Sequence, residues 1–282
     1  MQLLKAKNVG NWWPLAEGSV PSDQFVAGQT LQKCQEVFAP ANASVYQNSW
    51  VSQEDWKLLL AAGFGANLLS RQGEKLAWLD DGSGTSLTAS DDSLLLLYPW
   101  DLLQVNEQIV GALTESVHIG EVSPAAHIEG IIHVGVGSRI LPGVFIEGNA
   151  VIGENCKIGP NCYIRGNTAI GDGVHIGQAV EVKNSIVGHG SSVGHLSYVG
   201  DSVIGSKVNF GAATVTSNLR HDGKNHRTSV DGALVDTGRR KLGTIVGDHV
   251  HTGIHTAIYP GRKLGPYATT RPNESVEKDI FE

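Results

Sequence analysis

Aliphatic residues recur at every sixth position through much of the second half of the chain, and this period constrains the fold more than any other feature. The repeat comprises Ile128, Val134, Ile140, Ile146, Ile152, Ile158, Ile164, Ile170, Ile176 and Val182. A second column, two residues earlier, holds small or β-branched residues. Neither an α-helix nor an alternating hairpin strand keeps a period of six. Short strands joined by regular corners do, so the repeat predicts coils of three hexapeptides stacked into a parallel β-solenoid.

The period loosens after Val182, is interrupted by a polar stretch from Asn218 to Gly243, and resumes at Val246. Long excursions from a regular scaffold are costly to order and often carry function. We therefore predict a solenoid over residues 113–282 with an inserted functional loop at 218–243.

Residues 1–112 lack this period and predict a small α/β domain. QTLQKCQEVFA and SQEDWKLLLAAG are typical of amphipathic helices, the second with a serine N-cap and a glycine stop. KLAWLDDGSG and SLLLLYPW predict strands, and PWDLLQVNEQIVGAL predicts a linker helix that leads into the solenoid. The expected fold class is therefore mainly β: a parallel β-helix with a small N-terminal α/β domain and a helical linker.

Composition restricts the class of partner. The 282 residues include 21 basic and 28 acidic side chains, a balance that disfavours nucleic acid, because phosphate backbones need a broad basic surface. The three cysteines form neither a disulfide framework nor a CxxC metal pair. The N-terminus lacks the apolar core of a signal peptide, and LLLLYPW is too short to span a bilayer. We expect a soluble, cytoplasmic protein with no membrane partner.

Residues one coil apart should stack one strand spacing apart, and a coil of three hexapeptides takes about eighteen residues. Arg165 and Lys183 have this separation, and each follows an aliphatic repeat residue. Two adjacent cations repel each other unless an anion lies between them, so the pair indicates an anion site. The alternative is a solvated column in which Glu147, eighteen residues before Arg165, pairs with the arginine.

A second group of polar residues begins where the period loosens. His195 is followed by Tyr198 and then by Asn209, in a solenoid that is otherwise aliphatic. A neutral imidazole can take a proton from an attacking amine, which favours a catalytic role. An ordinary surface or core histidine is the alternative interpretation.

These residues carry a family resemblance. VEVKNSIVGHGSSVGHLSYVGDSVIGSKVNFGAATVTSNL resembles the acetyltransferase half of the bifunctional glucosamine-1-phosphate acetyltransferase / N-acetylglucosamine-1-phosphate uridyltransferase family. NLRHDGK followed by VDTGRRKLG is most similar to the archaeal-type sugar-1-phosphate nucleotidyltransferase/acetyltransferases. The resemblance covers about residues 100–270 and implies a left-handed β-helix that forms a homotrimer, with its site between subunits.

The resemblance implies an N-acetyltransferase that uses acetyl-CoA and acts by direct transfer on an amino-sugar 1-phosphate, glucosamine-1-phosphate or galactosamine-1-phosphate, in nucleotide-sugar biosynthesis. His195 would be the general base, and Asn218 would orient the amine or the acetyl group. The residues implied to hold the sugar phosphate are Arg165, Lys183, Tyr198, Asn209, Lys224 and Arg227.

Fewer residues of the sequence indicate where the coenzyme would bind. A backbone N–H near Ala212 or Ala213 would supply the oxyanion donor that a thioester carbonyl needs. Arg239, Arg240 and Lys241, in GRRKLG, either contact coenzyme phosphates or form a solvated loop end. HVHTGIH could suggest zinc, but its three histidines do not share one repeat register, so no metal is expected.

The chain also departs from the family pattern. Leu219, Ala213 and Ile254 replace a tyrosine, a glycine and a serine of the bacterial branch. The N-terminal part lacks the glycine-rich "GxGTR" loop that cradles nucleotide phosphates, so we expect a reduced or replaced domain without nucleotidyl transfer. The alternative function is a non-catalytic solenoid that binds a sugar nucleotide or a partner through a relic site.

Overall fold

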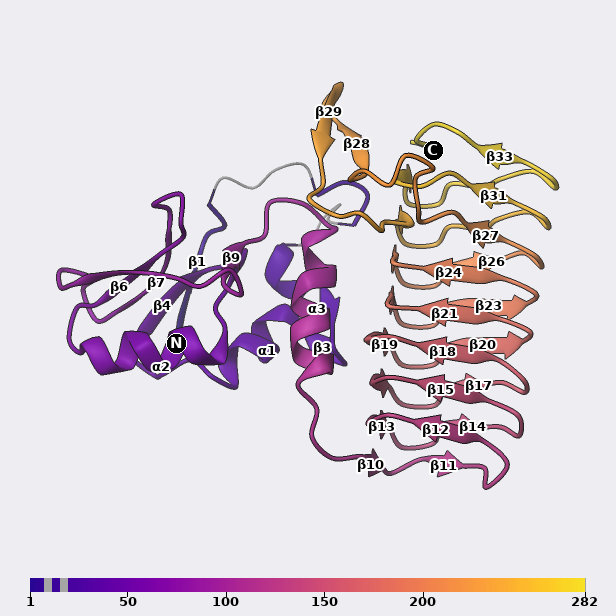
Figure 1. Cartoon of the computed structure of the whole chain (residues 1–282), viewed down its shortest axis with the longest axis horizontal. Coiled ribbons are helices and arrows are strands. Elements are labelled where there is room, and N and C mark those ends of the chain that lie inside the picture. The colour runs from indigo at the N-terminus through magenta and orange to yellow at the C-terminus, as the bar shows by residue number, and fades with distance from the viewer. Residues whose placement is uncertain (8–11, 16–19, 282) are drawn as a thin grey trace.

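The computed structural model describes residues 1–7, 12–15 and 20–281. Figure 1 shows an N-terminal α/β part beside a tall stack of coils, with helix α3 (Asp101–Gly111) between them. None of the helices within these residues combines the length and the apolar composition needed to cross a bilayer. The predicted fold class, a mainly β chain with a solenoid and a small N-terminal α/β part, is confirmed.

The N-terminal part is built on a mixed five-stranded sheet. In spatial order its strands are β1 (Gln2–Leu4), β4 (Ala43–Tyr46), β7 (Lys75–Leu79), β6 (Asn67–Leu69) and β8 (Ser86–Thr88). The remaining elements of this part are η1 (Pro21–Asp23), β2 (Phe25–Val26), β3 (Gln29–Thr30), α1 (Leu31–Glu36), β5 (Ser49–Trp50), α2 (Gln53–Ala62) and β9 (Leu94–Leu95).

The expected N-terminal helices form, and one of the expected strands is short. Helix α2 begins after Ser52, whose hydroxyl accepts a hydrogen bond from the Asp55 N–H (3.3 Å), and ends at Gly63 with φ 84°. The strand expected from SLLLLYPW is reduced to β9, because the next backbone N–H groups serve helix α3 instead. Those of Leu97 and Tyr98 donate to the Asp101 carboxylate at 2.8 and 2.9 Å.

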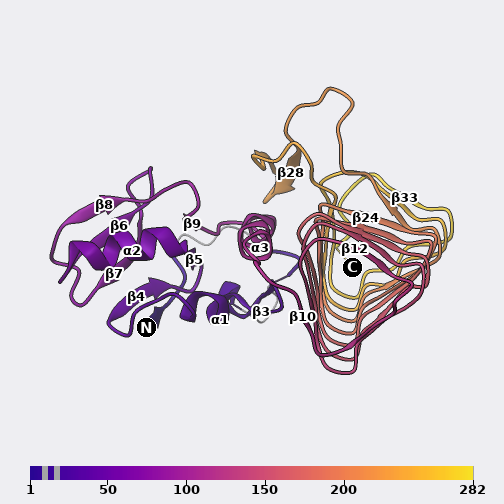
Figure 2. The ribbon, with the colours of Figure 1, turned by 60° about the horizontal axis from the view of Figure 1, so that its bottom comes forward.

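The solenoid has three faces, which Figure 2 shows as a stack of roughly triangular coils. Face 1 consists of β10 (Val117–His118), β13 (Ile132–Val134), β16 (Ala150–Ile152), β19 (Thr168–Ile170), β22 (Ile186–Val187), β25 (Val203–Ile204), β30 (Thr244–Val246) and β32 (Arg262–Leu264). Face 2 consists of β11 (Glu121–Val122), β14 (Arg139–Ile140), β17 (Lys157–Ile158), β20 (His175–Gln178), β23 (Ser192–His195) and β26 (Asn209–Phe210). Face 3 consists of β12 (His127–Glu129), β15 (Phe145–Glu147), β18 (Tyr163–Arg165), β21 (Glu181–Lys183), β24 (Tyr198–Gly200), β27 (Val215–Thr216), β31 (Ala257–Ile258) and β33 (Ser275–Val276).

The repeat residues point inward and form one continuous core. Ile146, Ile164 and Ile176 are fully buried, and so is Val182 at the position where the period loosens. Cys162 occupies one of the small positions of the same core, and burial raises the pKa of its thiol to about 12. Strands of neighbouring coils pair in parallel throughout, which is the geometry that a six-residue period predicts.

The loosening of the period has a local cause at the corner between faces 3 and 1. Arg165 pairs with Lys183, eighteen residues later, whereas Lys183 pairs with Gly200, seventeen residues later. The coil shortens because a tighter turn forms at Asn184 and Asp201, which have φ angles of 47° and 50°. Short polar side chains tolerate this left-handed conformation better than branched ones do. The shortened corner therefore carries polar side chains where earlier coils carry glycine.

The N-terminal part covers face 1. In the middle of this face the outward side chains are apolar as well as the inward ones, and Ala169, Ile186 and Val203 are at most 3% exposed. Ile186 and Val203 share one apolar cluster with Trp100 and Leu102, which lie at the start of helix α3. The interface between the two parts is thus a hydrophobic core in its own right.

The solenoid core sets a stability prediction. Replacement of fully buried Ile176 by alanine should lower the free energy of unfolding by about 2–5 kcal/mol, because stacked coils cannot collapse into the cavity. Val136→Ala, at a position that is 50% exposed, is the matched control and should change it by less than about 0.5 kcal/mol. Urea denaturation followed by circular dichroism measures both, and equal losses would contradict the inward placement of the repeat.

Candidate functional site

The predicted pairing of Arg165 with Lys183 is present, but each cation has its own carboxylate. The two residues are directly paired on β18 and β21. The Arg165 guanidinium contacts Glu181 at 2.7 Å, and the Lys183 ammonium contacts Asp201 at 2.7 Å. Glu147 does stack below Arg165, yet it accepts a hydrogen bond from the Tyr163 hydroxyl instead. The charges of the pair are therefore balanced inside the chain, by neither of the partners that the sequence suggested.

Asp201 is the centre of this cluster. Its side chain is 4% exposed and accepts two hydrogen bonds from Lys183, one from Asn184 at 3.1 Å and one from Asn218 at 2.5 Å. The sequence analysis did not include Asp201. The signal was available, however, because Asp201 follows Lys183 by the same eighteen residues that separate Arg165 from Lys183.

Tyr198 and Asn218 complete the cluster. The Asn218 amide donates to the Tyr198 hydroxyl at 2.9 Å as well as to Asp201. The pKa of Tyr198 is raised, first by burial and then by the negative charges of Asp201 and Glu181, so its hydroxyl stays protonated at neutral pH. The structure thus brings together four of the predicted site residues: Arg165, Lys183, Tyr198 and Asn218.

His195 lies outside this cluster. It ends β23 at the corner between faces 2 and 3, and its side chain is exposed. Among the described residues, the His195 ring makes no side-chain hydrogen bond, so a ligand that reaches this exposed side chain displaces no partner within the chain. Asn209 lies on face 2, between Ser192 and His251 of the neighbouring coils, and not beside Tyr198.

The two alanines predicted near the thioester differ in what they can donate. The Ala213 N–H donates to the His195 carbonyl oxygen at 3.0 Å, so it is already engaged in stacking the coils. The Ala212 carbonyl accepts from His255 of the next coil. The Ala213 N–H is therefore occupied within the chain, whereas the contact of Ala212 with the next coil uses its carbonyl.

The loop at 218–243 contains regular secondary structure. It contains the antiparallel hairpin of β28 (Arg227–Val230) and β29 (Ala233–Asp236), which Figure 1 places on the side of the solenoid that faces the N-terminal part. The Asn218 carbonyl accepts hydrogen bonds from the buried His226 ring (3.0 Å) and from the Leu242 N–H (3.1 Å). Both ends of the loop are therefore tied to Asn218.

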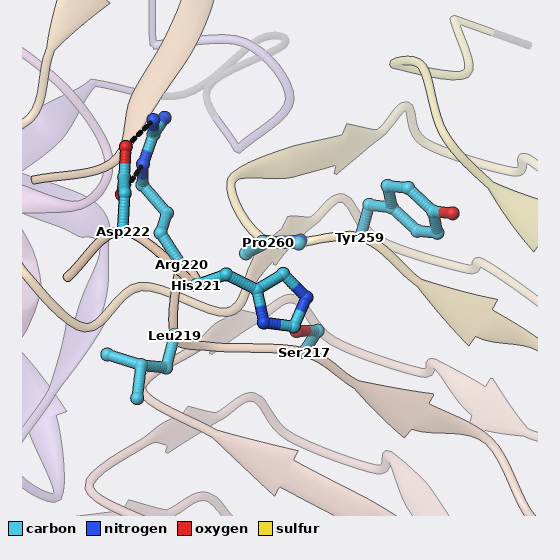
Figure 3. A pocket seen from close by; sticks show the side chains of 7 residues that line it. All are labelled: Ser217, Leu219, Arg220, His221, Asp222, Tyr259 and Pro260. Atoms are coloured by element: carbon cyan, nitrogen blue, oxygen red, sulfur yellow. Dashed lines mark hydrogen bonds and ion pairs between the residues drawn. The ribbon is translucent and has the colours of Figure 1, made fainter. Parts of the chain in front are cut away.

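Two pockets flank the loop. One, of about 580 Å³, is lined by Ser217, Leu219, Arg220, His221, Asp222, Tyr259 and Pro260. Figure 3 shows the Arg220 guanidinium joined to the Asp222 carboxylate by two hydrogen bonds, with the His221 ring and Ser217 near the centre of the view. His221 is a candidate ligand contact that the sequence analysis did not consider. Because Ser217 and Leu219 flank Asn218, this pocket adjoins the Asp201 cluster.

The second pocket, of about 690 Å³, contains two of the predicted phosphate contacts. Lys224 and Arg227 line it together with Arg262, and Lys183 and Tyr198 are not among its lining residues. Within one chain, these two loop cations are therefore not directed at the Asp201 cluster.

Arg239 has a partner inside the chain. Its guanidinium forms an ion pair with Glu107 of helix α3 and so faces the linker. Arg240 and Lys241 are exposed. The sequence could not show this contact because Glu107 and Arg239 lie 132 positions apart and in different parts of the molecule.

The histidines of HVHTGIH are dispersed. His249 stacks on Tyr267 with ring centroids 4.7 Å apart, while His251 bridges Asn209 and Thr269 on face 2. In the described part of the chain, no group of three or more His, Cys, Asp or Glu residues is arranged to hold a metal ion.

The buried ion pair yields a testable prediction. Asp201→Asn should lower the free energy of unfolding by about 3 kcal/mol, because the nearly buried Lys183 then loses its carboxylate partner. The double variant Asp201→Asn/Lys183→Met should recover part of this loss. Glu121→Gln, which removes an exposed pair with Arg139, is the control and should cost under about 1 kcal/mol. Additive effects of Asp201→Asn and Lys183→Met would contradict direct pairing.

His226 predicts a pH dependence. Burial lowers its pKa, and the positive charges of Arg220 and Arg262 act in the same direction against the Asn218 carbonyl. The unfolded chain therefore binds the proton more readily, so the stability that neutral His226 contributes is present above about pH 6.5 and is lost as the pH falls through the folded-state pKa. In urea titrations at several pH values, His226→Gln should flatten this decline, whereas exposed His118→Gln should follow the wild type.

Comparison with known proteins finds relatives of the C-terminal part of the chain. A family model described as the GMPPB C-terminal domain matches residues 146–279. The bifunctional sugar-1-phosphate nucleotidylyltransferase/acetyltransferase of Sulfurisphaera tokodaii is 43% identical over 182 residues, which are 64% of this chain and 45% of that protein. The bifunctional protein GlmU of Methanococcus maripaludis is 38% identical over 183 residues, 65% of this chain and 44% of that protein.

The chain thus spans less than half the length of the curated relatives it matches. Among solved structures, the UDP-N-acetylglucosamine acyltransferase from Campylobacter jejuni is 17% identical with a TM-score of 0.34, covering 57% of this chain and 68% of that one, a likeness too distant to bear on function. Over its C-terminal part, this chain is a homologue of the GlmU-like bifunctional sugar-1-phosphate nucleotidyltransferase/acetyltransferases.

Proposed function

We propose that this protein is an acetyl-CoA-dependent N-acetyltransferase that acts on an amino-sugar 1-phosphate. The observation that carries the proposal is the cluster of Lys183, Tyr198, Asp201 and Asn218, with exposed His195 at the corner where face 2 meets face 3, within a region homologous to sugar-phosphate acetyltransferases. The relative from Sulfurisphaera tokodaii is named as a sugar-1-phosphate nucleotidylyltransferase/acetyltransferase. The side chains of the cluster supply hydrogen-bond donors and acceptors that suit such a substrate.

The transfer requires a base, an oxyanion donor and a leaving thiolate. The exposed His195 imidazole takes a proton as the amine nitrogen of the sugar attacks the thioester carbonyl carbon. The developing oxyanion is stabilised by a backbone N–H, for which Ala212 is the candidate. The C–N bond forms, the C–S bond breaks, and the coenzyme thiolate leaves with the proton that the imidazolium returns.

The sugar phosphate has donors available in spite of the internal ion pairs. The Arg165 guanidinium has five N–H groups, and Glu181 engages its Nε and one terminal nitrogen, so the remaining N–H groups are free for a phosphate. Glu181, whose side chain is 32% exposed, is then suited to a hydroxyl or amine group of the sugar, whereas the nearly buried Asp201 carboxylate is occupied by Lys183, Asn184 and Asn218. Asn218, held by Asp201 and Tyr198, supplies a fixed carboxamide at the edge of this surface.

A homotrimer is part of the proposal. In one chain, His195 and the Asp201 cluster lie at the two ends of β24, while Asn209 faces outward from face 2 and Lys224 lines a separate pocket. Packing of face 2 or the loop of one subunit against face 3 of the next would bring these groups to one ligand. Sedimentation analysis of the purified protein tests the stoichiometry.

The activity is tested by following release of free thiol from acetyl-CoA with glucosamine-1-phosphate or galactosamine-1-phosphate. His195→Ala should lower kcat by about 10²–10⁴-fold, the usual contribution of a positioned general base. His118→Ala removes an exposed histidine of the first coil and should leave kcat unchanged. No thiol release with either sugar, or full activity of His195→Ala, contradicts the proposal.

The balanced charges of Arg165 and Lys183 favour a second candidate, a solenoid that binds a sugar phosphate or sugar nucleotide without turning it over. Thermal stabilisation by the sugar ligand, without stabilisation by acetyl-CoA and without thiol release, supports this alternative.

A further inference from the structure

The Asp201 cluster does not end at the solenoid surface. Helix α3 of the linker directs Glu107 at the shortened corner, where its Oε1 accepts a hydrogen bond from the Asn184 amide at 2.7 Å. The same Asn184 nitrogen donates to Asp201 at 3.1 Å. One amide thus links a carboxylate of the linker helix to the carboxylate that holds Lys183 and Asn218.

Glu107 also holds the far end of the loop. Its carboxylate forms the ion pair with Arg239, four residues before Gly243, where the loop returns to the solenoid. The Arg239 carbonyl in turn accepts a hydrogen bond from the His226 N–H at 2.8 Å, and the His226 ring donates to the Asn218 carbonyl. One linker carboxylate is therefore connected to both ends of the loop that begins at Asn218.

The side chains in these contacts are largely buried, so each polar group needs a hydrogen-bond partner within the chain. The side chains of Arg239 and Glu107 are 19% and 31% exposed, and the Arg239 Nε atom is buried without a hydrogen-bond partner among the described residues. Glu107 is the one carboxylate that hydrogen-bonds Arg239 in the described ranges. A guanidinium that depends on one carboxylate is released when that carboxylate loses its charge.

We infer that Glu107 is a positioning residue of the acyltransferase site, through which the N-terminal part and its linker helix hold Asn184, Asp201 and the loop from Asn218 to Arg239 in place. The inference rests on the proposed function for its effect on turnover, but its structural content does not. The N-terminal part then contributes to acyl transfer without any nucleotide chemistry of its own.

Glu107→Gln tests this role in the full chain. Glutamine keeps an oxygen for the Asn184 amide and removes the charge that holds Arg239. We expect kcat to fall about tenfold, equivalent to about 1.4 kcal/mol in the transition state, with little change in KM for acetyl-CoA. Arg239→Gln should have a similar effect, and the double variant should be no worse than either single variant. Glu54→Gln, an exposed carboxylate of helix α2, is the control.

Hydrogen exchange supplies a readout that needs no substrate. In Glu107→Gln, backbone amides of residues 218–243 should exchange about tenfold faster, while those of the solenoid core keep wild-type protection. Unchanged loop exchange together with unchanged kcat overturns the inference. If the wild type releases no thiol, the proposed function fails, and the loop exchange alone then decides whether Glu107 positions the loop. Additive losses in the double variant also contradict a shared contact.

Discussion

Parallel hydrogen bonding between successive coils determines where every other part of this molecule lies. Each strand pairs with the one a coil later, so side chains at a given corner form a vertical column. At the corner between faces 3 and 1 this column runs through Gly166, Asn184, Asp201 and Asn218. Glycine gives way to amides and a carboxylate where the corner tightens by one residue. The polar cluster is thus a consequence of stacking, with each member placed by the one below.

The Lys183–Asp201 pair illustrates how such a column can serve both folding and chemistry. Two charges removed from water cost more than they return unless further hydrogen bonds satisfy them. Asn184 and Asn218 supply those bonds here, and Asn218 is also the first residue of the loop. The same contacts that make the buried carboxylate tolerable therefore fix the loop entrance and orient Tyr198.

The N-terminal part packs beside this site through apolar contacts that the six-residue period does not predict. The period records only the inward side chains, yet face 1 is apolar outward as well, at Ala169, Ile186 and Val203. Strands buried on both sides need a second layer, and helix α3 with its neighbours provides it. Because α3 packs there, Glu107 lies at the shortened corner, where it accepts a hydrogen bond from Asn184 and forms an ion pair with Arg239. Through Glu107, the linker helix therefore contacts the candidate site directly.

The sequence by itself determined the solenoid, the stacking of Arg165 with Lys183, the place where the period loosens and the start of the loop at Asn218. These follow from local spacing, because coil stacking converts a fixed separation along the chain into a contact in space. Asp201 was within reach of the same reasoning and was passed over. Only the tertiary structure decided that each cation has an internal carboxylate, that Arg239 turns to Glu107, and that His195 lies apart from the Asp201 cluster. Those outcomes depend on side-chain direction, on packing between distant segments and on burial, and no repeat along the chain encodes them.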